Sequence, residues 1–162
     1  MTTANGLISL QLELSSLLAR LPEEECQLIR DWADRHAEFA PEAFHWVFCE
    51  SSTYVDTRAW AGSQLRNGDP ALAVVCANSL LQSADPDDRD TGITFLLTLP
   101  DALFEDAALG LLRDPYPYIQ ILAAEYALLH GKADEAKAAI DELSASPKTE
   151  ISKSAKSLQA RY

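Results

Sequence analysis

The stretch Asp114–Gly131, "DPYPYIQILAAEYALLHG", decides the fold that the sequence predicts. It opens with an Asp-Pro turn, continues with apolar residues at helical spacing and closes on a glycine, which marks a helix end. Two small residues, Ala123 and Ala124, stand in the middle of the apolar face, where a helix normally carries bulky side chains. Because the distance between packed helices depends on the side chains at the contact, we expect a neighbouring helix to approach closely there. The stretch is therefore predicted to be one member of a packed helix pair.

Most of the chain is punctuated in the same way, with a proline or an acidic residue before each apolar segment. Proline at the first helical position loses no hydrogen bond, and acidic side chains favour the positive end of a helix. We expect helices over about 7–21, 22–36, 41–50, 53–68, 70–84, 87–99, 101–113, 116–131, 132–146 and 148–162. No run of β-branched residues with period two indicates a strand. Short connections imply antiparallel neighbours, so the predicted fold class is all-α.

The helix signals recur about every 30 residues, which is typical of a stacked helical repeat. Prolines precede three helices at nearly equal spacing, at Pro86, Pro115 and Pro147. A β-branched residue followed four positions later by alanine also occurs three times, at Val55/Ala59, Ile119/Ala123 and Ile151/Ala155. In this second series Val55 and Ile119 are twice as far apart in the sequence as Ile119 and Ile151. The helix after Pro86 lies midway between Val55 and Ile119, where the series would have a further member.

The segment Leu111–Leu158, with its Asp-Pro turn followed by Ile, a small residue, Leu and Gly, resembles HEAT-type α-helical repeats. The family often has Arg after the Val/Ile position, where this chain has Gln120 and Ser152. The resemblance implies a short right-handed α-solenoid with a slightly concave face, and usually protein recognition rather than a reaction. We expect one domain over 1–162, with an N-terminal helical cap over 1–50 and HEAT-like repeats over 51–162.

The net charge of −12, from 25 acidic and 13 basic residues, argues against nucleic acid or an anionic membrane as the partner, because both attract positive charge. Three widely spaced cysteines predict no disulfide framework and a reducing compartment. The N-terminus has no basic region, and no uncharged run is long enough to span a bilayer. These features predict a cytoplasmic location.

Two histidines, His36 and His45, flank Glu38 and Glu42 and are candidates for a metal cluster. Their spacing matches no zinc pattern, and no cysteine lies within four residues of another, so we expect ordinary helix positions and no metal. The acidic run from Asp85 has glycine at the wrong place for a calcium loop and no closing glutamate.

The cysteines Cys26, Cys49 and Cys76 show no sign of a reactive thiolate. Cys26 and Cys49 have acidic neighbours, and Cys76 stands in an apolar segment. Glycine-rich phosphate loops and nucleophile elbows are missing from the sequence. We therefore expect no cofactor and no enzymatic activity.

The span from Asp85 to Asp114 holds eight acids and two arginines, half of the net charge. In a solenoid these acids would form a ridge beside two tyrosines at a repeat turn. The predicted partner-binding residues are Asp87, Asp88, Asp90, Glu105, Asp106, Asp114, Tyr116 and Tyr118. A second aromatic group, Phe44, Trp46 and Phe48, is expected in the core, with an exposed partner anchor as the alternative.

These features favour a non-catalytic protein-binding module that neutralises a basic toxin or effector, in the manner of an immunity protein. An adaptor or scaffold subunit is the first alternative. A HEAT-like nucleic-acid enzyme is the second, and the shortage of clustered bases disfavours it. The sequence leaves the oligomeric state open.

Overall fold

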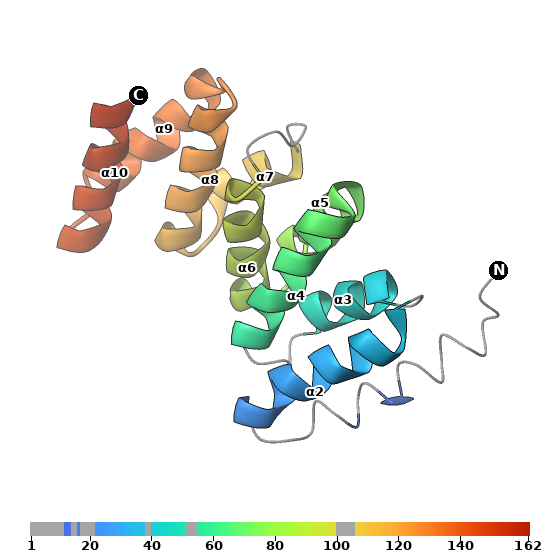
Figure 1. The fold of residues 1–162 in the computed structure, drawn as a ribbon. Coiled ribbons are helices and arrows are strands. Elements are labelled where there is room, and N and C mark those ends of the chain that lie inside the picture. Colours follow the sequence, from blue (N-terminus) through green and yellow to red (C-terminus); the bar gives the residue numbers. More distant parts are fainter. Residues whose placement is uncertain (1–11, 14–15, 17–21, 38–39, 51–54, 100–105) are drawn as a thin grey trace. The chain divides into compact units, whose positions relative to one another are not determined.

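The computed structural model describes residues 12–13, 16, 22–37, 40–50, 55–99 and 106–162 (Figure 1). Within these ranges the chain is helical and has no strand, which confirms the prediction of an all-α fold. The elements are α2 (Pro22–Arg35), α3 (Ala40–Cys49), α4 (Val55–Gly68), α5 (Pro70–Leu81), α6 (Pro86–Leu97), α7 (Asp106–Gly110), the 3₁₀ turn η2 (Leu111–Arg113), α8 (Pro117–Leu129), α9 (Ala133–Ser144) and α10 (Thr149–Arg161).

Most of the expected helices are present with ends shifted by a few residues. Nearly all of the helix expected over 7–21 lies outside the described residues, as does the expected start at Asp101. From Asp106 the segment expected as one helix is a single α-turn that tightens into η2 before the Asp114-Pro115 turn.

The chain divides into two compact units, Met1–Cys76 and Ala77–Tyr162. In the first unit α2, α3 and α4 contact one another. Their buried side chains include Ile29, Trp32, Val47, Phe48 and Leu65. Phe48 therefore belongs to the core, whereas Phe44 and Trp46 are partly buried and Phe44 packs edge-on against Trp60 at 5.3 Å. The single-domain expectation stays a prediction.

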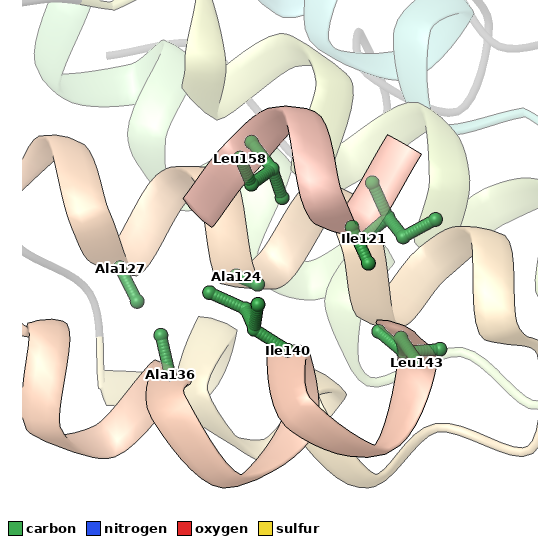
Figure 2. Close-up of a cluster of buried hydrophobic side chains, with 8 residues drawn as sticks. Ile121, Ala124, Ala127, Ala136, Ile140, Leu143 and Leu158 are labelled. Carbon is green, nitrogen blue, oxygen red and sulfur yellow. The ribbon is translucent and has the colours of Figure 1, made fainter. Parts of the chain in front are cut away.

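In the second unit α8 contacts α6, α9 and α10, and α9 also contacts η2. Figure 2 shows the core where α8, α9 and α10 meet, and half of its eight residues are alanines. The cluster consists of Ile121, Ala124, Ala127, Ala136, Ile140, Leu143, Ala155 and Leu158. The alanines bring the helix backbones close together, and the isoleucines and leucines fill the space beside them.

Gly131 ends α8 as the sequence predicts. It has a φ of 71°, in the left-handed region that glycine adopts without strain. The amide of Lys132 donates to the carbonyl of Ala127 at 2.8 Å, and the amide of Gly131 donates to that of Leu128 at 3.1 Å. These two bonds form a Schellman motif, which satisfies carbonyls that the helix end would otherwise leave unpaired.

Four helices begin at nearly equal steps along the chain, at Val55, Pro86, Pro117 and Thr149. The seventh residue of each helix is small and buried, namely Ala61, Gly92, Ala123 and Ala155. The expected pairing of Val55 with Ala59 is therefore wrong by two positions. Ala59 is exposed, and Ala61 takes the buried position that corresponds to Ala123.

The fourth residue of each of these helices makes a similar hydrogen bond. In each helix its side chain donates to a backbone carbonyl in the segment before the helix. The bonds are Arg58 Nε to Phe48 O (2.9 Å), Arg89 Nη1 to Ser83 O and Ala84 O (2.9 Å each), Gln120 Nε2 to Asp114 O (2.5 Å) and Ser152 Oγ to Ser144 O (2.7 Å). Gln120 and Ser152 thus make the same kind of contact as the arginines at the corresponding positions.

Gly92 lies where two helices approach closely. A Cβ added there would lie 2.9 Å from the carbonyl oxygen of Ala77 and 3.0 Å from side-chain atoms of Leu80 and Leu81. A backbone oxygen cannot move aside as a flexible side chain can. Only glycine therefore allows α6 to lie this close to the end of α5.

We expect Gly92→Ala to lower the free energy of unfolding by about 1–3 kcal/mol through overpacking. Gly110→Ala is the matched control, because an added Cβ at Gly110 meets nothing within 4 Å. Urea unfolding followed by far-ultraviolet circular dichroism measures both changes. Equal stability of the Gly92 variant and the wild type would contradict the close approach.

Candidate functional site

The eight predicted partner-binding residues fall into different environments. Exposed side chains are those of Asp87, Asp106, Tyr116 and Tyr118, whereas Asp90 is partly buried. Asp88 and Asp114 are buried, with exposed fractions of 9% and 5%. Glu105 lies outside the described residues. The acidic ridge is therefore wrong at Asp88 and Asp114, because these carboxylates face internal partners and not the surface.

Asp114 forms a buried ion pair with Arg89. The Nε of Arg89 donates to Oδ2 of Asp114 at 2.6 Å, and Nη2 donates to Oδ1 at 3.3 Å. The Oδ1 atom also accepts a hydrogen bond from the amide of Tyr116 at 2.9 Å. Through these bonds one carboxylate links the first turn of α6 to the turn that starts α8.

The two tyrosines at this turn are the exposed part of the arrangement. Tyr116 is 49% exposed and Tyr118 is 59% exposed. The guanidinium of Arg89 lies 5.9 Å from the ring centroid of Tyr116, within range of a cation–π interaction. Tyr116 is thus held at its backbone by Asp114 and at its ring by Arg89, and its remaining surface faces solvent.

Two acidic side chains at the start of α6 form hydrogen bonds within the segment where the helix begins. Asp85 caps α6, because its Oδ1 accepts from the amide of Asp87 at 3.0 Å. Asp88 accepts from the hydroxyl of Ser83 at 2.9 Å. Burial, reinforced by the charge of Asp87, raises the pKa of Asp90 above its ordinary value. The Oδ1 atom of Asp90 is buried without a hydrogen-bond partner among the described residues.

A second group of chemically competent side chains lies in the first unit. His45 and Cys49 on α3 meet Cys76 on α5, and one ligand atom from each lies within 4.8 Å of the others. Cys76 is fully buried, and His45 and Cys49 are partly buried. A hydrogen bond with Cys49 raises the pKa of His45 against the opposing effect of burial. A hydrogen bond with Cys49, together with burial, raises the pKa of the Cys76 thiol.

Sequence reasoning missed this group because it considered His45 together with His36 and two glutamates, and considered the cysteines only with one another. The spacing of four positions between His45 and Cys49 is a detectable signal, since it places both side chains on one face of a helix. No local pattern could have added Cys76, which is separated from Cys49 by the whole of α4 and reaches the group only through the packing of α5.

No protein-family model, curated protein or solved structure matches the chain. The function must therefore be inferred from the geometry of the chain itself. Among the helices that the structure describes, none combines the length and apolar character needed to cross a bilayer.

We expect Arg89→Met or Asp114→Leu alone to lower the free energy of unfolding by about 3 kcal/mol or more, because each leaves a buried charge unpaired. The double variant should lose less than the sum of the two single losses. The exposed pair Arg161–Glu125 is the control, since its removal should cost at most about 1 kcal/mol. Additive losses at Arg89 and Asp114 in denaturant unfolding would show that the pair is not coupled.

Asp90→Asn should stabilise the chain at neutral pH by up to about 1 kcal/mol, because the amide removes a charge that burial penalises. A carboxyl with a raised folded-state pKa loses this penalty as the pH falls and it becomes protonated. The gain should therefore disappear near pH 4, roughly the ordinary pKa of an aspartate. Thermal unfolding between neutral and acidic pH measures it. Asp134→Asn, at an exposed acid of α9, is the control, and a gain of the same size there would refute the assignment.

Proposed function

We propose that the chain is a HEAT-like α-solenoid that acts as a non-catalytic protein-binding module. The recurrence of helix starts at nearly equal steps supports the solenoid, as does the small buried residue at the seventh position of each of these helices. The contacts of the second unit also support it. There α6, α8 and α10 follow one another in one layer, and η2 and α9 follow one another in a second. This is the order of contacts that stacked helix pairs produce.

The observation that carries the binding role is the pair of exposed tyrosines at the start of α8. Tyrosine provides a large apolar surface and a hydroxyl group with few rotatable bonds, and it is enriched among residues that dominate binding energy. Tyr116 is already fixed by Asp114 and Arg89, so little conformational entropy is lost when a partner covers it. The proposed surface is defined by Tyr116, Tyr118 and the exposed acid Asp87.

The charge of the chain points to a basic partner. A net charge of −12 attracts a basic protein over a distance comparable with the Debye length and raises its association rate. A small acidic module of this kind fits a neutraliser of a basic toxin or effector, and an adaptor role rests on the same surface. We place it in a reducing cytoplasm, where its cysteines would stay reduced.

A groove of 480 Å³ between η2 and α9 is lined by Leu109, Gly110, Leu112, Arg113, Glu135, Ala138, Ala139 and Glu142. Its polar lining consists of one arginine and two glutamates.

A photoreactive amino acid at position 118 tests the surface in cells. We expect it to crosslink one dominant basic protein that the same amino acid at position 162 does not capture. Tyr162 is the matched control, because it is 56% exposed on the same unit at the end of α10.

The captured protein is then purified and titrated against the full chain. We expect Tyr118→Ala to weaken binding at least about tenfold, as is typical for a dominant interface tyrosine. Asp87→Asn should slow association mainly at low salt, and Tyr162→Ala should change neither quantity. Equal capture from both positions, an acidic partner, or tight binding of DNA at low salt would contradict the proposal.

A further inference from the structure

The binding role proposed above does not use the group formed by His45, Cys49 and Cys76. All three residues belong to the first unit, which ends at Cys76. Two come from consecutive turns of α3, and the third comes from α5. The structure therefore places one imidazole nitrogen and two sulfur atoms within 4.8 Å of one another.

We propose that His45, Cys49 and Cys76 bind one zinc ion. Imidazole and thiolate are the ligands that zinc prefers in proteins, whereas magnesium and calcium prefer oxygen ligands. Two thiolates and a neutral imidazole also balance the charge of Zn²⁺. The resulting neutral complex suits a site where Cys76 is fully buried and the other two ligands are partly buried.

The observed distances fit such a complex after a small closure. Tetrahedral zinc, with Zn–S of about 2.3 Å and Zn–N of about 2.0 Å, separates its ligand atoms by about 3.5–3.8 Å. The three ligand atoms already lie within 4.8 Å of one another. Closing the difference requires movements of about 1 Å, which rotations about the staggered side-chain torsions of His45 and Cys49 provide.

Three protein ligands leave one tetrahedral position for water or for a group from another molecule. The ion would link α3 to α5, two helices that the chain joins only through α4. Because zinc would bind the folded chain and not the unfolded one, it would stabilise the first unit by mass action. This role does not depend on the proposed partner surface, which lies in the second unit.

The test uses the full chain, reduced and freed of metal with a chelator, and Co²⁺ as a spectroscopic probe. We expect sulfur-to-cobalt charge-transfer absorption in the near ultraviolet and tetrahedral bands in the visible, saturating at one equivalent. Addition of Zn²⁺ should remove both signals, and zinc should raise the Tm of the chain.

Cys49→Ser, Cys76→Ser and His45→Gln should each weaken cobalt binding at least tenfold and abolish the rise in Tm. His36→Gln is the matched control. It removes the other histidine of the first unit, whose ring packs on Trp32 at 4.8 Å, and it should leave metal binding unchanged. Titrations in the Cys26→Ser background leave only the thiols of the group as sulfur ligands. If circular dichroism shows that Cys76→Ser does not fold, the test uses Cys49→Ser and His45→Gln, whose positions are only partly buried.

The proposal is overturned if the reduced chain shows no charge-transfer absorption, or if cobalt binding is equally strong in Cys49→Ser and in the wild type. It is also overturned if Cys49 and Cys76 join in a disulfide in air and the reduced chain takes up no metal. Each of these results leaves the tyrosine surface untouched, because none of them involves a residue of the second unit.

Discussion

The constraint on which the helix packing depends is a small, buried residue at the seventh position of α4, α6, α8 and α10. Ala61, Gly92, Ala123 and Ala155 occupy this position, and all four are buried. Packing density in a protein interior is nearly constant, so a small side chain at a contact must be matched by a short distance between helices. At Gly92 that distance is so short that a methyl group would meet a backbone oxygen. The larger apolar residues fill the space that remains on either side of these contacts.

A second regular feature connects each of these helices to the chain before it. The fourth residue of each helix donates a hydrogen bond to a preceding backbone carbonyl, although the side chain is Arg58, Arg89, Gln120 or Ser152. The position of the hydrogen-bond donor in the helix is therefore kept, although two of the donor side chains are charged and two are neutral. Arg89 also reaches a carboxylate, that of Asp114, and this buried ion pair reduces the acidity of the surface below what the sequence suggests.

The two candidate sites use different kinds of chemistry. The surface at Tyr116 and Tyr118 consists of exposed aromatic groups held by a buried polar network, which suits recognition of another protein. The group of His45, Cys49 and Cys76 consists of soft ligand atoms at a largely buried point, which suits a metal ion. They lie in separate units of the chain and share no residue.

The sequence by itself determined the helical class and most helix ends, because proline, capping acids and glycine act within a few residues of their own position. The end of α8 at Gly131 is an example, since its left-handed φ follows from a local requirement. The sequence also indicated that helix starts recur, but it placed the first of the small buried residues two positions too early, because Ala59 and Ala61 cannot be told apart without knowing which face is buried. Only the tertiary structure decided that Asp88 and Asp114 turn inward and that Cys76 joins His45 and Cys49. These facts depend on contacts between residues far apart in the chain, such as Arg89 and Asp114, and no local pattern of side chains encodes them.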